Sequence, residues 1–328
     1  MRRPSGGELL AGGCRRAGGA ILAVFRTTRM SRPAPFCLVR RERESPIMTS
    51  SALSGPASTV PLRGGVDIPV LGLGVFRAPA GRETRQAVTA ALDAGYRHID
   101  TAAVYGNEAD VGQALRDTKV ARDEVFVTTK LWNADHGYRQ TLDAFERSRR
   151  LLQVDHVDLY LVHWPVAGPR LETWRAMEHL LGTGKVRAIG VSNYMSRHLE
   201  ELLEHAEQPP AVNQIELSPY NWASRAGTVD LCRGNGIQVE AYSPLTKGRK
   251  LADPPLVAVA DAHGRSTAQV LIRWALQHGL VVLPKSTRSE RIAANADVFG
   301  FTLTDAEMTA LDALDENLVT GWDPTTAP

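Results

Sequence analysis

The strongest constraint on the fold is a repeat in which short apolar runs alternate with helical patterns from about residue 60 onward. The apolar runs end in polar residues or glycine, as parallel strands buried on both faces do. Eight such units in about 240 residues match a closed (β/α)8 barrel, also called a TIM barrel, better than two doubly wound domains. The expected strands and helices cover, in order, residues 70–74 and 83–94, 97–100 and 108–117, 124–130 and 138–152, 156–163 and 171–181, 188–192 and 197–204, 211–216 and 223–234, 237–242 and 267–278, and 280–284 and 290–297.

Two further segments frame the repeat. Residues 59–63 and 67–70, joined by a pair of glycines, predict an N-terminal β-hairpin that plugs the bottom of the barrel. Residues 303–314 predict one more amphipathic helix, followed by a tail to residue 328. We therefore expect one barrel domain over residues 56–328 and an extension over residues 1–55.

The first 47 residues differ from the rest in composition. They hold ten arginines against three glutamates, so their formal charge of +7 leaves −5 for the remainder of a chain whose total is +2. The segment has no lysine and no helical or alternating apolar period, so we predict a disordered N-terminal extension. A transit peptide, a secretory signal and a true start at Met30 or Met48 are the alternatives, of which we favour a start at Met48.

Composition excludes several classes of protein. With 43% hydrophobic and 23% charged residues, the chain can bury a sizeable core, so global disorder is excluded. Its apolar runs fall short of the roughly 18 residues that a membrane span needs. The three cysteines are odd in number and far apart, which supports neither a disulfide framework nor a zinc site. We therefore expect a cytoplasmic protein without a metal.

Chemically active side chains occur where three adjacent strands are expected to end. Asp100 ends the second strand and Tyr105 follows it, Lys130 ends the third strand, and His163 ends the fourth. Taken singly, each has an ordinary structural alternative, such as a helix cap, loop packing, a snorkelling amine or a core histidine. Because the C-terminal ends of barrel strands meet at one rim, their joint occurrence predicts an active site there.

The longer motifs around these residues resemble the aldo-keto reductase family. The resemblance runs from about residue 60 to the end of the chain, in order and at the family's spacing. Residues 72–76 and 96–108 look most like the bacterial 2,5-diketo-D-gluconate reductase branch. The matching segments are 95–108, 129–132, 161–165, 190–193, 213–216 and 283–286.

The resemblance implies a catalytic tetrad and a reaction. Tyr105 would be the general acid that protonates the alkoxide formed as hydride reaches a carbonyl carbon. Lys130 would lower the pKa of that phenol, and Asp100 would pair with Lys130 and orient it. His163 would hydrogen-bond the substrate carbonyl. The implied function is NADPH-dependent reduction of aldehydes, ketones or keto-sugars by a monomeric oxidoreductase.

The sequence also indicates where the cofactor would bind. No strand is followed by the G-x-G-x-x-G pattern of a Rossmann site. Instead, three cations and a hydroxyl follow the last strand at the start of a helix, a favourable place for a phosphate. The resemblance assigns these residues and Asn295 to the 2'-phosphate and adenine of NADP, although Ala294 replaces an acid common in the family. The group consists of Lys285, Ser286, Arg288 and Arg291.

Further site residues follow from the resemblance. The nicotinamide would stack on the ring of Tyr242, and its carboxamide would bind polar groups at the ends of neighbouring strands. The cofactor residues implied here are Ser192, Asn193, Gln214, Tyr242, Ser243 and Leu245. The substrate pocket would have apolar walls, formed by Phe76, Trp132 and Trp164 beside His163. Such walls favour breadth of substrate.

Two other functions compete with this interpretation. The first is a regulatory or structural protein that binds NADPH on the same barrel with little turnover. The second is a metal-dependent hydrolase, which would need His98 and His163 as ligands and lacks an H-x-H after the first strand. We expect neither a nucleic-acid partner nor a membrane partner.

Overall fold

Eight parallel strands form the barrel in a computed structural model that describes residues 53–327. Neighbouring strands pair in chain order, and bridges from Leu71 to Val282 and from Gly74 to Lys285 close the last strand onto the first. The (β/α)8 prediction is therefore confirmed. The strands are β3 (Leu73–Gly74), β4 (His98–Asp100), β5 (Phe126–Leu131), β6 (Val157–Val162), β7 (Val186–Ser192), β8 (Val212–Glu216), β9 (Gln238–Tyr242) and β10 (Val281–Leu283).

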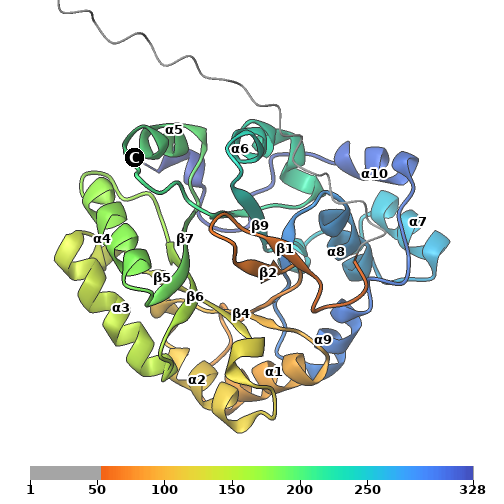
Figure 1. Ribbon diagram of the computed structural model, residues 1–328. Helices are drawn as coiled ribbons and strands as arrows, with labels where there is room; N and C mark the ends of the chain where they lie inside the picture. Colours follow the sequence, from red (N-terminus) through yellow and green to blue (C-terminus); the bar gives the residue numbers. More distant parts are fainter. Residues whose placement is uncertain (1–52, 328) are drawn as a thin grey trace, which may run out of the picture. The chain divides into compact units, whose positions relative to one another are not determined.

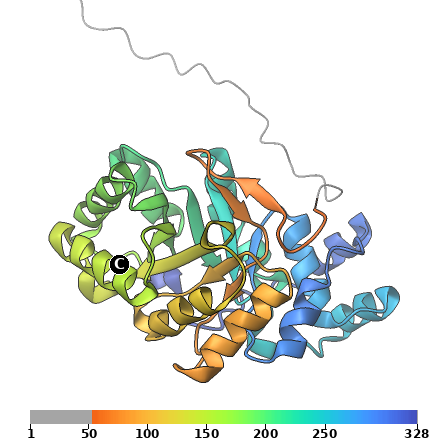
Figure 2. The same ribbon diagram turned by 60° about the horizontal axis from the view of Figure 1, so that its bottom comes forward.

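Helices surround the barrel as an outer ring (Figures 1 and 2). Their buried residues recur at helical spacing, as in α3, where Thr141, Ala144, Phe145, Ser148 and Leu152 face inward. The helices are α1 (Arg82–Asp93), α2 (Glu108–Asp117), α3 (Tyr138–Leu152), α4 (Arg170–Gly182), α5 (Ser196–His205), α6 (Trp222–Gly234), α7 (Pro254–His263), α8 (Thr267–Gln277), α9 (Ser289–Ala296) and α10 (Asp305–Asp312).

The sequence pattern did not predict α7. Its apolar residues are spread around the helix, and only Leu256 and Ala260 are buried, so it lacks the apolar stripe that marked the other helices. The final helix is also shorter than expected, because α10 covers Asp305–Asp312 of the predicted 303–314. Short 3-10 turns include η2 (Ala103–Tyr105), η3 (Arg122–Glu124), η4 (Asn133–Asp135), η5 (Pro219–Asn221), η6 (Thr246–Gly248) and η7 (Pro324–Thr326).

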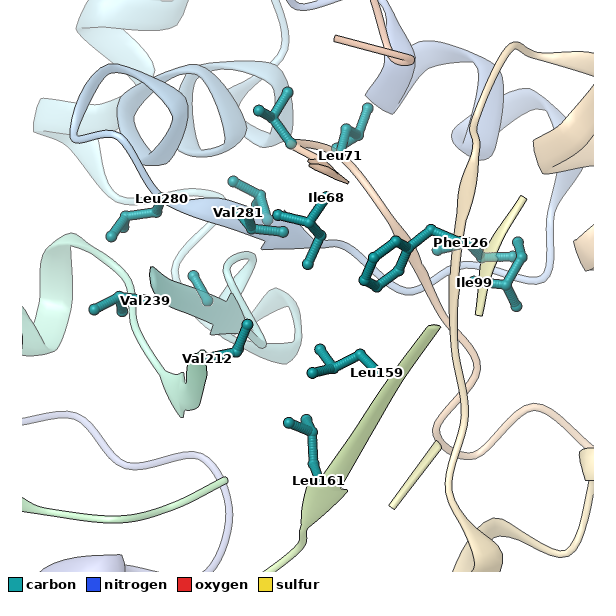
Figure 3. Packing of buried hydrophobic residues seen from close by; sticks show 14 of the residues in the cluster. Ile68, Leu71, Ile99, Phe126, Leu159, Leu161, Val212, Val239, Leu280 and Val281 are labelled. Carbon is teal, nitrogen blue, oxygen red and sulfur yellow. The ribbon is translucent and has the colours of Figure 1, made fainter. Parts of the chain in front are cut away.

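The predicted hairpin is present at the bottom of the barrel. Strands β1 (Thr59–Pro61) and β2 (Asp67–Pro69) pair antiparallel, and Ile68 on β2 is fully buried. Figure 3 shows Ile68 beside Val281 and Phe126, which begin β10 and β5. The hairpin therefore closes the N-terminal end of the barrel, and only the C-terminal end is left for a site.

Aliphatic side chains fill the lower barrel. Figure 3 shows Leu159 and Val212 in this layer, and both are fully buried in one continuous hydrophobic cluster. Close packing of this kind fixes the directions of the strands and so the positions of the residues at their upper ends.

Some sequence-based predictions concern residues outside this description. The predicted extension over residues 1–55 lies outside the described residues except for residues 53–55, of which Leu53 is buried. Met30, Met48, Cys14 and Cys37 lie outside it as well. Within residues 53–327, no helix combines the length and the apolar character that crossing a membrane would require.

Candidate active site

A buried ion pair lies at the upper ends of β4 and β5. The Lys130 ammonium donates to both oxygens of Asp100, with Nζ–Oδ1 and Nζ–Oδ2 distances of 2.6 and 2.7 Å, and to the Thr101 carbonyl oxygen at 2.9 Å. Lys130 is fully buried and Asp100 is 3% exposed. Because both strands are extended and adjacent, residues at their ends meet inside the barrel.

Tyr105 lies above this pair on the 3-10 turn η2. Lys130 Nζ is 5.1 Å from the centroid of its ring, and the ring contacts Phe76 at 5.0 Å and His163 at 5.8 Å between centroids. Within residues 53–327 the Tyr105 hydroxyl makes no hydrogen bond, so it is available to an incoming molecule. The structure thus brings together the four residues predicted as a tetrad.

The charge environment of Tyr105 differs from the sequence-based expectation. Lys130 was expected to lower the pKa of this phenol, but burial raises that pKa well above its usual range, and the negative charges of Asp100 and, when it is ionised, of Glu240 raise it further. Lys130 is in direct contact with the Asp100 carboxylate, so its ammonium does not outweigh burial and the acids in their effect on the phenol. The resting phenol therefore carries its proton.

His163 faces Tyr105 across the site as a neutral ring. Burial and the nearby Lys130 charge lower the pKa of His163 well below its usual value. Its Nδ1 is buried without a hydrogen-bond partner among the described residues, and Trp132 meets the ring edge at 5.5 Å. A neutral imidazole can donate one hydrogen bond to a carbonyl oxygen without bringing a charge.

A chain of hydrogen bonds links the ends of β7, β8 and β9. Ser192 donates to the Gln214 carbonyl oxygen at 2.9 Å, and Tyr242 donates to Asn193 Oδ1 at 2.8 Å. Asn193 takes a positive φ of 64°, which asparagine tolerates better than most residues, and its amide nitrogen donates to the His163 carbonyl oxygen at 2.9 Å. The predicted nicotinamide residues therefore form one connected rim.

A second cluster of predicted residues lies at the N-terminus of α9. Lys285, Arg288 and Arg291 are exposed, and none forms an ion pair with a carboxylate in the part of the chain that the structure describes. Ser286 is 9% exposed and accepts a hydrogen bond from the Arg288 backbone nitrogen at 3.1 Å. Asn295 lies on the buried side of α9. Ser243 and Leu245 lie in the loop after β9, where Ser243 has a φ of 50°.

Aromatic rings line the mouth of the barrel. Phe76 is 44% exposed, and Trp164 contacts Trp322 at 4.8 Å between ring centroids. A small pocket beside them is lined by Asn133, Trp164, Pro165, Val166, Trp322 and Ala327. The C-terminal tail therefore contributes to the predicted substrate walls.

Sequence reasoning missed two residues of this region. Trp322 is 65% exposed in a polar tail, and the presence of a tryptophan in such a tail could have indicated a role in the site. Glu240 is fully buried in β9, and an acid between the apolar residues Val239 and Ala241 of a strand could have indicated a buried functional group. Gln214 Nε2 donates to Glu240 Oε2 at 2.7 Å and to Asp100 Oδ2 at 2.9 Å.

The buried pair yields a test of how the site is held together. Lys130→Met leaves the Asp100 carboxylate buried without its ammonium, so we expect the free energy of unfolding to fall by about 3 to 5 kcal/mol. The double variant Asp100→Asn with Lys130→Met removes both charges and should lose less than the sum of the two single variants. Urea unfolding of Lys130→Met, Asp100→Asn and the double variant measures the three losses.

The matched control is the partly exposed pair of Lys250 and Glu316, at 2.7 Å. Lys250→Met should cost no more than about 1 kcal/mol, because solvent screens that pair. Strict additivity of the two changes at Asp100 and Lys130 would contradict a coupled buried pair.

Comparisons with known proteins agree with this geometry. The sequence profile of the aldo/keto reductase family matches residues 70–316. The chain is 49% identical to a glyoxal reductase of Bacillus subtilis over 266 residues, which covers 81% of this chain and 96% of that protein. It is 46% identical to a morphine 6-dehydrogenase of Pseudomonas putida, over 83% of this chain and 96% of that protein.

Solved structures show the same likeness. An aldo-keto reductase from a deep-sea metagenome library has a TM-score of 0.78 at 41% identity, covering 83% of this chain and all of that one. A Bombyx mori aldo-keto reductase solved in complex with NADP has a TM-score of 0.77 at 37% identity, covering 84% of this chain and 99% of that one. This chain therefore belongs to the aldo/keto reductase family.

Proposed function

We propose that this protein reduces aldehydes, ketones or keto-sugars to alcohols with NADPH, using Tyr105 as the general acid. It is an NADP-dependent oxidoreductase of its family. One observation carries the assignment of roles: a protonated phenol with a free hydroxyl faces a neutral imidazole directly above a buried ammonium–carboxylate pair. A regulatory protein that only binds NADPH would not need this arrangement.

The residues present fit NADPH. Lys285, Arg288 and Arg291 at the start of α9 have no carboxylate partner among residues 53–327 and suit a phosphate, because guanidinium groups and helix N-terminal amides both favour an oxyanion. The cofactor bound in this way supplies the hydride. Ser192, Asn193 and Gln214 would hold the carboxamide of the nicotinamide, and Tyr242 would support the ring.

We assign the other steps to the chain's own side chains. His163 would donate a hydrogen bond to the substrate carbonyl oxygen and polarise it. Tyr105 would give its proton to that oxygen, which becomes the alcohol, and would regain a proton from solvent. Lys130 would stabilise the phenolate while it exists, and Asp100 would hold the ammonium in place. The sum is one carbonyl reduced, one NADPH oxidised and one proton consumed.

The substrate class follows from the pocket walls. Phe76, Trp132, Trp164 and Trp322 present large apolar faces, which suit many carbonyl compounds rather than one. Relatives named for glyoxal and for morphine differ widely in substrate, which supports breadth. We place the chain nearest the 2,5-diketo-D-gluconate reductase branch on residues 72–76 and 96–108. A screen of aldehydes, α-dicarbonyls and keto-sugars with NADPH tests this placement.

We also propose that the barrel over residues 56–328 carries the activity as a monomer in the cytoplasm, without nucleic acid. The site residues named above lie between Phe76 and Ala327, and Cys232, the cysteine that the structure describes, is buried and forms no disulfide. If residues 1–55 are an extension, the protein beginning at Met48 should match the full chain in activity and melting temperature.

The general-acid role predicts the behaviour of Tyr105→Phe. The ring is kept and only the proton donor is removed, so NADPH binding should be unchanged while kcat falls by about 10² to 10⁴. Aldehyde-dependent oxidation of NADPH and fluorescence titration measure the two quantities. Tyr138→Phe, at a 40% exposed tyrosine on α3, is the matched control and should keep full activity. Retention of more than about a tenth of kcat in Tyr105→Phe would contradict the assignment of Tyr105 as the general acid.

The cofactor site predicts the behaviour of Arg291→Ala. NADPH and NADH differ only at the 2'-phosphate, so this change should weaken NADPH by about 1.5 to 3 kcal/mol and leave NADH nearly unchanged. The loss should shrink at high salt, because the cluster is exposed. Fluorescence titration with both cofactors measures it, with Arg139→Ala on the exposed face of α3 as control. Equal weakening of NADPH and NADH would mean that Arg291 supports the local fold instead.

A further inference from the structure

A second buried acid lies beneath the site, and the scheme above does not use it. Glu240 on β9 is fully buried, and its Oε2 accepts the hydrogen bond from Gln214 Nε2. Its Oε1 has no hydrogen-bond partner among the described residues and lies 3.7 Å from Nε2 of His98. An ionised carboxylate buried with an unpartnered oxygen would cost several kcal/mol, about 1 to 3 or more for the lost hydrogen bond alone.

Glu240 and Asp100 together orient the amide of Gln214. Both of its N–H groups are directed at acid oxygens, Asp100 Oδ2 at 2.9 Å and Glu240 Oε2 at 2.7 Å. The amide carbonyl oxygen of Gln214 is therefore left as an acceptor. Removing the Glu240 contact would let the amide turn about its terminal torsion, which is a soft rotation.

The count of buried charges indicates the state of Glu240. Lys130 is the ammonium in this network, and Asp100 already neutralises it in direct contact. Burial and the Asp100 charge raise the pKa of Glu240 to about 8, while burial and Lys130 lower the pKa of His98 to about 3. A neutral Glu240 therefore leaves the network without excess charge, and an ionised one would add an unbalanced negative charge.

Within residues 53–327, Lys130 is the cationic group that acts on Glu240, and Asp100 already pairs with it. His98 and Asp100 act on Glu240 from β4, Lys130 from β5 and Gln214 from β8. Thr128 Oγ1 already shares a hydrogen bond with His98 Nε2, at 3.0 Å. Above them, the charge of Glu240 acts on Tyr105 and opposes loss of the phenol proton.

We propose that Glu240 is a positioning residue for carbonyl reduction that works in its protonated form, fixing the Gln214 amide and keeping a second negative charge away from Tyr105. This rests on the proposed function, because it concerns the same proton transfer. While Glu240 holds its proton, Tyr105 can become a phenolate beside the Lys130–Asp100 pair without a further negative charge nearby. Once Glu240 ionises, the phenolate forms against a like charge and reduction slows.

The test is the pH profile of kcat for aldehyde reduction by the wild type and by Glu240→Gln, which keeps the shape and stays neutral. From about pH 7 to about pH 9.5 we expect the wild type to lose about three- to tenfold of its rate, and the variant to keep its rate over that range. A role confined to packing would change the rate equally at every pH. Profiles of the same shape would overturn the proposal.

Glu216→Gln is the matched control. Glu216 is also a buried strand-end acid, 3% exposed on β8, but its Oε1 accepts from Thr320 outside the Gln214 network. Its variant should keep the alkaline loss seen in the wild type. Loss of that pH dependence in Glu216→Gln as well would count against a specific role for Glu240.

An infrared readout separates this inference from the proposed function. A buried protonated acid shows a carbonyl stretch that disappears on ionisation, so the wild-type difference spectrum between about pH 6 and about pH 10 should contain a band that Glu240→Gln lacks. If the wild type reduces carbonyls but this band is missing, only the role of Glu240 fails. If the band is present but the wild type oxidises no NADPH with any carbonyl compound, the proposed function fails.

Discussion

The contact between the Lys130 ammonium and the Asp100 carboxylate is the interaction on which the rest of the site depends. Two charges removed from water are stable only in close contact and with their remaining hydrogen-bonding positions filled. The Thr101 carbonyl oxygen, just after β4, accepts a hydrogen bond from Lys130, and the Gln214 amide on β8 donates one to Asp100. Together with Gln214, the pair thereby links the C-terminal ends of β4, β5 and β8.

The same pair sets the protonation states around it. Because Asp100 neutralises Lys130 at close range, burial dominates the environment of Tyr105 and keeps the phenol protonated. Burial and the Lys130 charge together keep His163 neutral. A proton donor and a neutral hydrogen-bond donor thus face each other before any substrate arrives, which costs no reorganisation at the moment of reaction.

Much of the fold and the tetrad could be predicted from sequence because each depends on local pattern. The strand-and-helix repeat fixed the barrel, and the rule that barrel strands end at one rim brought Asp100, Lys130 and His163 together. Helix α7 was missed because its burial is too slight to leave a stripe. Glu240 and Trp322 were missed because their partners, Gln214 and Trp164, are distant in sequence.

The pKa of Tyr105 was the least predictable property. Pairing Tyr105 with Lys130 suggested a lowered pKa, but the sign depends on how many acids share that lysine and on how deeply all of them are buried. Those quantities exist only once the barrel has closed. Sequence motifs name the participants, whereas the packing around Asp100, Lys130 and Glu240 decides their charges.

An absorbance titration of Tyr105 tests the central claim most directly. The difference between the wild type and Tyr105→Phe isolates the phenolate band of this one side chain, without substrate or cofactor. If burial and the two acids outweigh Lys130, the difference should show no phenolate up to about pH 10, the ordinary value for tyrosine. A phenolate band that grows in near neutral pH would mean that Lys130 controls Tyr105, and it would contradict the account.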